Sequence, residues 1–205
     1  MKEIFIWQLF YLLFTLSLQP SLTLTGRLNH LMPRKLILIG PESTGKTTLS
    51  IYLAKLYNFD LITEYSRTYL SKKNNSYSYE DLKKIAVKQN QIEKDNSSEK
   101  IIMDTDLLTI KIWSEFKYGS CDPEIEKIIS SYDRNKRYYL LLKDDIKWEY
   151  DPLRESKNDR SEIFSLHKNL LEKKGFDYSI ISGIGNNRIN NAIKVVEERF
   201  LSKNN

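Results

Sequence analysis

The chain has 205 residues, of which 40% are hydrophobic and 29% charged, and a formal net charge of +5. The length allows one sizeable core but not two full domains, and a mean hydropathy of -0.49 excludes a polytopic membrane protein. Cys121 is the only cysteine, which excludes an internal disulfide and a cysteine-based zinc site and fits a reducing, cytoplasmic setting. The basic balance suits a phosphorylated ligand, an anionic lipid or a nucleic acid equally.

Residues 1–31 differ from the rest of the chain. The run Ile4–Leu18 is apolar except for Gln8 and has the length of a signal-peptide core, short of the ~20 residues of a spanning helix. It is a real signal or anchor, a hydrophobic appendage that packs on the protein, or an upstream extension that is not normally translated. Met32, just before the first predicted strand, favours the last interpretation. We expect a single domain over residues 32–205, and membrane contact only if the leader is real.

The remaining sequence alternates short apolar runs with helical periodicities, which predicts an α/β fold with a parallel sheet covered on both faces. The five expected strands are Leu36–Ile39, Leu61–Ile62, Ile101–Met103, Tyr138–Leu142 and Tyr178–Ile181. The expected helices are Thr47–Tyr57, Tyr79–Asn96 with a Ser78–Asp81 capping pair, Leu107–Phe116, one opening with Asp122 and Pro123, Ser161–Lys174 and Asn187–Phe200. Between these, residues 143–160 are polar and predict a loop or lid.

Residues Gly40–Thr47 read GPESTGKT and carry the strongest signal in the sequence. This is the pattern G-x-x-x-x-G-K-[ST], placed directly between a strand and a helix, where backbone N–H groups and the helix N-terminus hold phosphate. Lys46 is expected to reach the β- and γ-phosphates of ATP, and Thr47 to ligate Mg²⁺. The nucleotide-contacting residues expected here are Gly40, Glu42, Ser43, Thr44, Gly45, Lys46, Thr47 and Thr48. The fold class is therefore a P-loop NTPase.

Two aspartates follow the strand Ile101–Met103. Asp104 occupies the place where P-loop proteins put the carboxylate that holds the magnesium shell, so we expect it to be a metal residue. Asp106 is a candidate substrate residue. The alternative for Asp104, Thr105 or Asp106 is to cap the helix that begins at Leu107.

The rest of the sequence narrows the class of P-loop protein. A GTPase needs N-K-x-D, and Asn135-Lys136-Arg137-Tyr138 lacks the aspartate. A small-molecule kinase needs a carboxylate near the acceptor hydroxyl and a lid with arginines. Glu64, after the second strand, is expected to hold or deprotonate that hydroxyl, with Arg67 one helical turn later. The alternative is a capping Glu64 paired with a surface arginine.

The lid candidate is the segment Trp148–Arg154, with Arg160 just beyond it. Arginine suits planar contact with phosphate oxygens, so Arg154 and Arg160 are expected to act on the transferred phosphoryl group. The alternative is an ordinary charged loop. After the last strand, Asn187 or Arg188 is expected to contact adenine. His167 is expected to be structural or exposed. The lysines are scattered, which argues against nucleic-acid binding.

Taken together, the motifs resemble the ribosylnicotinamide kinase domain of the NadR family over about residues 35–200. The resemblance rests on GPESTGKTTL, EYSRTYL, Tyr79–Asp81 with Ile85-Ala86 and Gln91, Asp104-Thr105-Asp106, and W-x-x-D-x-x-R at Trp148–Arg154. It implies Mg·ATP-dependent phosphorylation of the 5′-hydroxyl of nicotinamide riboside, and a kinase-type sheet with the Asp104 strand beside the P-loop strand. The substrate residues it implies are Glu64, Tyr65, Arg67, Asp106, Trp148 and Asp151.

The sequence departs from this family in two places. The family often has an aromatic residue just before the matching glutamate, and this chain has Thr63 there. Tyr65, Tyr69 and Trp113 are the candidates for a stacking face in its place. Pro152 follows Asp151, where the family usually has glycine. The two histidines, His30 and His167, do not form the H-x-G-H site of the family's adenylyltransferase domain. Two rival hypotheses remain: a kinase for another small acceptor, and a nucleotide-binding regulatory switch.

Overall fold

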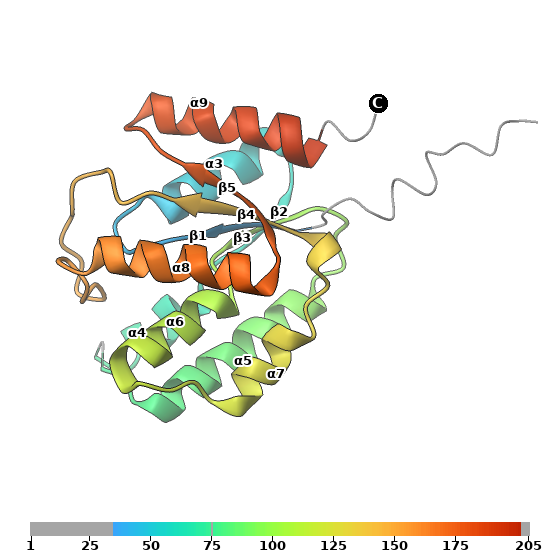
Figure 1. Ribbon diagram of the computed structural model, residues 1–205. Coiled ribbons are helices and arrows are strands. Elements are labelled where there is room, and N and C mark those ends of the chain that lie inside the picture. Colours follow the sequence, from blue (N-terminus) through green and yellow to red (C-terminus); the bar gives the residue numbers. More distant parts are fainter. Residues whose placement is uncertain (1–34, 75, 202–205) are drawn as a thin grey trace, which may run out of the picture.

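Five parallel strands form the centre of the structure, a computed structural model that describes residues 35–74 and 76–201 (Figure 1). Their order across the sheet is β2-β3-β1-β4-β5. The strands are β1 (Lys35–Ile39), β2 (Asp60–Ile62), β3 (Ile101–Asp104), β4 (Arg137–Leu142) and β5 (Asp177–Ile181). This confirms the expected P-loop, kinase-type sheet, with the Asp104 strand beside the P-loop strand. The proposed leader, residues 1–31, lies outside the described residues.

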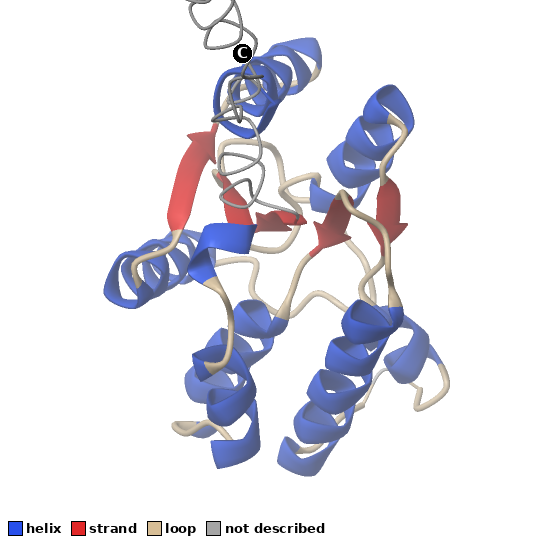
Figure 2. Cartoon of the chain, turned by 90° about the vertical axis from the view of Figure 1, so that its right-hand side faces the viewer, coloured by secondary structure: helices blue, strands red, loops and turns tan. Residues whose placement is uncertain are grey.

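Helices cover both faces of the sheet (Figures 1 and 2). On one face lie α3 (Lys46–Tyr57) and α9 (Asn186–Val195), which continues as the π-helical η3 (Val196–Leu201). On the other lie α4 (Tyr65–Ser71), α5 (Tyr79–Asp95), α6 (Leu107–Tyr118), α7 (Pro123–Ser130) and α8 (Arg160–Lys174), while the 3₁₀ turn η2 (Arg134–Lys136) leads into β4.

The core divides into two clusters because β1 and β4 are buried on both faces. Leu36 and Leu38 pack towards α3 and α9, whereas Ile37 and Ile39 pack towards the helices of the other face. Burial on both faces explains why these strands read as continuous apolar runs rather than as alternating patterns.

Local signals placed most helix starts correctly. Ser78 and Asp81 form the expected capping box at the start of α5, and Asp122 caps α7 with Pro123 in its first turn. Helix α4 was not among the expected helices, because only Ser66 and Leu70 are buried in its seven residues and one such pair gives little periodicity. The expected last helix is α-helical only to Val195.

The strand register sets the position of the site. Leu38 of β1 pairs with Asp104 of β3, so Asp104 lies beside the end of the strand that leads into the phosphate loop. All five strands are parallel, and their carboxyl ends therefore meet at one edge of the sheet. No helix within residues 35–74 and 76–201 is long and apolar enough to cross a bilayer.

Candidate active site

The loop between β1 and α3 has the backbone that phosphate binding needs. Gly40 has a φ of 136°, and a Cβ atom there would lie 2.6 Å from the carbonyl oxygen of Leu142. Only glycine fits such a close approach of two backbones. Gly45 caps α3 in the left-handed conformation, with a φ of 79°. The loop thus enters the helix with its N–H groups free of side-chain caps.

Lys46 is folded into this loop. Its Nζ donates to the carbonyl oxygens of Gly40 at 2.9 Å and Pro41 at 2.8 Å. Burial lowers the pKa of Lys46, and the nearby carboxylates of Glu64 and Asp104 act against that shift. The ammonium group therefore lies at the bottom of the site, between the phosphate loop and two acidic side chains.

The residues present fit a magnesium ion. Asp104 is 1% exposed and ends β3, and its Oδ1 atom has no hydrogen-bond partner. Burial raises the pKa of Asp104, while a hydrogen bond with Thr47 lowers it. A buried carboxylate oxygen beside a threonine hydroxyl suits a hard cation with oxygen ligands. The described residues hold no group of three or more His, Cys, Asp or Glu side chains able to hold a metal. Mg²⁺ is usually bound through one or two carboxylates together with substrate phosphates and water.

Glu64 lies where β2 gives way to α4. Its Oε1 accepts a hydrogen bond from Ser66 Oγ at 2.6 Å, and its Oε2 lies 3.7 Å from Arg67 Nε. Burial raises the pKa of Glu64, and Ser66 and Lys46 act in the opposite direction. Gln89, which is 1% exposed, fixes this segment by accepting from the N–H of Tyr65 at 2.8 Å. Gln91, the glutamine quoted for the family resemblance, is exposed.

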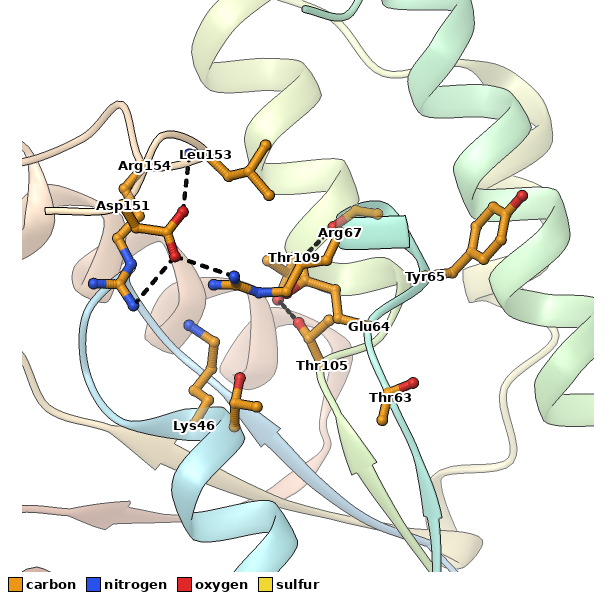
Figure 3. Close-up of polar contacts among 12 residues, drawn as sticks. Lys46, Thr63, Glu64, Tyr65, Arg67, Thr105, Thr109, Asp151, Leu153 and Arg154 are labelled. Atoms are coloured by element: carbon orange, nitrogen blue, oxygen red, sulfur yellow. Dashed lines mark hydrogen bonds and ion pairs between the residues drawn. The ribbon is translucent and has the colours of Figure 1, made fainter. Parts of the chain in front are cut away.

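The lid, residues 143–159, is the segment between β4 and α8, and it contacts both the phosphate loop and the start of α4. Asp151 Oδ2 accepts from Arg67 Nη1 at 3.1 Å and lies 3.8 Å from Arg154 Nη2. Figure 3 shows these two guanidinium groups on either side of Asp151, with Lys46 below them. Arg154 Nη1 also lies 3.3 Å from Ser43 Oγ, which accepts from the N–H of Glu149 at 2.9 Å. The lid thus touches the phosphate loop and the Glu64 segment at once.

Arg160 has a different place from the one expected. Its guanidinium donates to the carbonyl oxygens of Glu42 at 3.1 Å, Ser43 at 3.2 Å and Ile146 at 2.9 Å. Arg160 therefore holds the backbone of the phosphate loop through its carbonyl oxygens and does not point towards the phosphate site. Arg188 acts similarly on the other side, with a bond to the carbonyl oxygen of Thr44 at 3.1 Å. We now propose both arginines as positioning residues.

Replacing Arg160 with alanine is expected to weaken ATP binding and lower the melting temperature, because three backbone acceptors lose a charged donor at an expected cost of about 1–3 kcal/mol. The measurements are thermal unfolding and the KM for ATP. Lys157→Ala, an exposed change in the lid three residues before Arg160, is the matched control. A variant with normal melting and normal KM for ATP but a reduced kcat would return Arg160 to the catalytic role first expected.

A cleft of about 360 Å³ runs past the phosphate loop, Glu64, Arg67 and Arg154, whereas Asp104, Asp151 and Arg160 are not on its wall. On the face of the sheet that α4 and α6 cover, the cleft wall includes Ser66, Leu70, Thr109 and Trp113, with Leu153 of the lid, and we take this part as the acceptor end. On the face that α3 and α9 cover, the wall includes Tyr52, Gly185, Arg188 and Ile189, with Ile146 of the lid. The phosphate loop lies between, so the cleft has room for a substrate on each side of a transferred phosphoryl group. Leu70 and Thr109 were not expected here, since apolar or lone hydroxyl side chains on helices usually indicate packing, and Leu153 is an apolar residue in the otherwise polar lid.

Several expected substrate residues do not line this cleft. Tyr65 packs against the core and the ring of Tyr69, and Figure 3 shows Thr63 and Tyr65 pointing away from Lys46. Trp148 is also absent from the cleft wall. Asp106 is fully buried, where it caps α6 and accepts hydrogen bonds from Tyr139 and Arg137. Asp106 thus caps α6, as the alternative predicted, and its other two contacts hold it in the core. We do not propose it as a substrate residue.

Comparison with known proteins places the chain in a family. Residues 35–188 match the AAA domain family. The chain belongs to this family. The chain is also similar to the trifunctional NAD biosynthesis/regulator protein NadR of Escherichia coli strain K12, with 28% identity over 154 residues, 71% of this chain and 37% of the relative. The chain thus spans less than two fifths of that relative.

Solved structures agree with this assignment. NadR protein in complex with NR superimposes with a TM-score of 0.69 at 20% identity, over 86% of this chain and 53% of that one. Thymidylate kinase from Ehrlichia chaffeensis gives a TM-score of 0.53 at 16% identity, over 80% of this chain and 99% of that one. These likenesses confirm the P-loop kinase fold, and with the sequence match they confirm the resemblance to the NadR-type kinase domain.

Proposed function

We propose that the protein transfers the γ-phosphoryl group of ATP to the 5′-hydroxyl of a nucleoside, and that this nucleoside is nicotinamide riboside. One observation carries the proposal. Lys46 of the phosphate loop, Glu64 and Arg67 at the start of α4, and Arg154 of the lid come from three separate segments and line one cleft. Phosphoryl transfer to a hydroxyl depends on positioning and on cations that stabilise the transferred charge, and a carboxylate, two guanidinium groups and an ammonium supply both. The likeness to NadR supports the same chemistry.

ATP is proposed to enter with its phosphates in the loop and its nucleoside towards Tyr52, Arg188 and Ile189. Thr47 and Asp104 would hold Mg²⁺, which when bound neutralises charge on the β- and γ-phosphate oxygens. Lys46 would leave the carbonyl oxygens of Gly40 and Pro41 to contact phosphate. The lid excludes water from the cleft, so that the acceptor hydroxyl rather than water reaches the phosphorus atom.

The acceptor is proposed to place its 5′-hydroxyl against Glu64. The hydroxyl oxygen forms a bond to the γ-phosphorus, the bond from that phosphorus to the bridging oxygen of ADP breaks, and the hydroxyl proton passes to the Glu64 carboxylate. Arg154 and Arg67 lie on the lid side, where they balance the charge spread over the transferred group. These residues supply positioning and electrostatic stabilisation.

Trp113 is the aromatic side chain best placed to receive the base. It lines the acceptor end of the cleft, whereas Tyr65 and Trp148 do not. A pyridinium ring carries a positive charge, and an indole face attracts cations more strongly than other aromatic rings do. Trp113 could thus replace the aromatic that the family often carries at the position of Thr63.

The test is ATP consumption by the full chain with a panel of nucleosides and nucleotides, with products identified by mass spectrometry. Nicotinamide mononucleotide as the preferred product supports the proposal. Preferred phosphorylation of a different nucleoside or of a nucleotide assigns another acceptor. ATP binding with no acceptor-stimulated turnover would instead favour the regulatory switch.

Replacing Arg154 with alanine is expected to lower kcat by about 10²-fold while the KM for ATP changes little, because its charge acts on the phosphoryl group in transfer. Steady-state kinetics with both substrates varied provide the measurement. The exposed lid residue Lys147, changed to alanine, serves as control. Equal losses in kcat and in ATP binding would show that Arg154 contributes to ground-state binding instead.

A further inference from the structure

Three hydroxyl and imidazole groups form a buried chain beside the acceptor end of the cleft. Thr105 Oγ1 lies 2.8 Å from Thr109 Oγ1, which lies 3.2 Å from His167 Nε2. On the far side, His167 Nδ1 lies 2.8 Å from the carbonyl oxygen of Ile163. The chain joins the end of β3, the first turn of α6 and the middle of α8. None of the three side chains is assigned a role in phosphoryl transfer above.

The direction of each proton in this chain is fixed. The carbonyl oxygen of Ile163 can only accept, so Nδ1 of His167 carries the hydrogen. His167 is fully buried, and burial lowers its pKa to about 3, so the ring is neutral and Nε2 is an acceptor. Thr109 must therefore donate its one proton to His167. Thr105 in turn must donate to Thr109.

This leaves Thr109 able to accept but unable to donate. A hydroxyl has one proton and two acceptor sites, and Thr109 has used the proton and one of those sites. Its side chain lines the cleft at 3% exposure, on the same wall as Trp113, one helical turn further along α6. One acceptor site of Thr109 thus remains for a ligand that lies against Trp113.

The backbone supports a specialised role for this chain. Thr105 has a φ of 74°, in the left-handed region that β-branched residues rarely adopt. Its N–H bond to the carbonyl oxygen of Leu38 at 3.0 Å and its bond to Thr109 hold it there. Strain of this kind is found mainly where the surroundings fix a functional geometry.

We propose that Thr109 is a specificity residue which selects acceptors carrying an O–H or N–H donor at this position. The inference rests on the proposed kinase function. Two groups of nicotinamide riboside have this chemistry: a ribose hydroxyl and the amide N–H of the base. A substrate with a carboxylate at that position would place two hydrogen-bond-accepting oxygens against each other. A substrate without the hydroxyl would leave the Thr109 oxygen without a donor, and both kinds of substrate are rejected.

The experiment measures kcat/KM for the full chain and its Thr109→Val and Thr109→Ser variants. The acceptors are nicotinamide riboside, its 2′-deoxy and 3′-deoxy analogues, and nicotinic acid riboside. With nicotinamide riboside, valine is expected to lower kcat/KM by about tenfold, mainly through the acceptor KM, while serine stays close to the wild type. One analogue lacks the group that donates to Thr109, and with that analogue the valine variant and the wild type should have similar kcat/KM values. The analogue that behaves in this way shows whether the donor is a ribose hydroxyl or the amide.

Controls separate a specificity role from a structural one. Thr68→Val changes an exposed threonine of α4 and is expected to leave all four acceptors unaffected. Melting temperatures report folding, and Thr109→Ala replaces the valine variant if that one does not fold. An equal loss with every acceptor, or a raised KM for ATP, overturns the inference. If the wild type phosphorylates none of the acceptors, the proposed function fails instead.

Discussion

Replacing Lys46 with alanine is expected to lower kcat by about 10³-fold or more, the largest effect of any single change in the phosphate loop. The ammonium group lies between loop carbonyls and the carboxylates of Glu64 and Asp104. Its removal leaves those two carboxylates without their nearest cation in the loop, just where ATP must bring negative phosphates. Both ATP binding and stabilisation of the transferred group should suffer. Steady-state kinetics and calorimetric titration with ATP measure the two losses separately.

Lys55→Ala is the matched control for this variant. Lys55 lies in the last turn of the same helix, where it is exposed. It should retain the wild-type kcat and ATP affinity, so that loss of a positive charge from α3 is not itself the cause. If Lys46→Ala kept more than a tenth of the wild-type kcat, the loop would not be the phosphate site.

The fold was predictable because its signals are local. Each strand of the sheet is a short apolar run, and the glycine pattern from Gly40 to Gly45 has one structural meaning when a strand precedes it and a helix follows. Capping residues such as Ser78 and Asp122 marked helix starts for the same reason. The exception was α4, whose seven residues contain too little periodicity to be recognised.

The site was only partly predictable, because residue type does not determine direction. Arg154 and Arg160 are six residues apart in one polar segment. Yet Arg154 lies in the lid next to Asp151, while Arg160 begins α8 and bonds the back of the phosphate loop. The difference depends on where a helix starts, and on backbone carbonyls more than a hundred residues away in the sequence.

The aspartates after β3 show the same limit. Asp104 and Asp106 are two residues apart, and Thr105 between them adopts the left-handed conformation. This local turn lets one carboxylate lie beside the phosphate loop while the other enters the core. In the core, Asp106 accepts a hydrogen bond from Arg137, which is 31 residues away in the sequence. Burial raises the pKa of Asp106 to about 6, and Arg137 acts against that shift. No pattern in the sequence indicates this pairing.

Replacing Glu64 with glutamine tests whether this carboxylate moves a proton or only holds the hydroxyl. If it is the general base, kcat should fall by about 10²- to 10³-fold, because an amide keeps the shape and can still form hydrogen bonds but accepts no proton. If it only holds the hydroxyl, the loss should be a few-fold. Glu80→Gln, an exposed change at the start of α5, is the control.

The pH profile separates these outcomes independently of their size. Burial raises the pKa of Glu64 above its ordinary value, with Lys46 and Ser66 acting against the shift. A base works only when ionised, so the wild-type kcat should rise as pH increases through this raised pKa and then level off. Glu64→Gln should lack that rise. A variant that keeps the acid limb of the profile would show that another group titrates, and Glu64 would then be a hydroxyl-holding residue rather than the base.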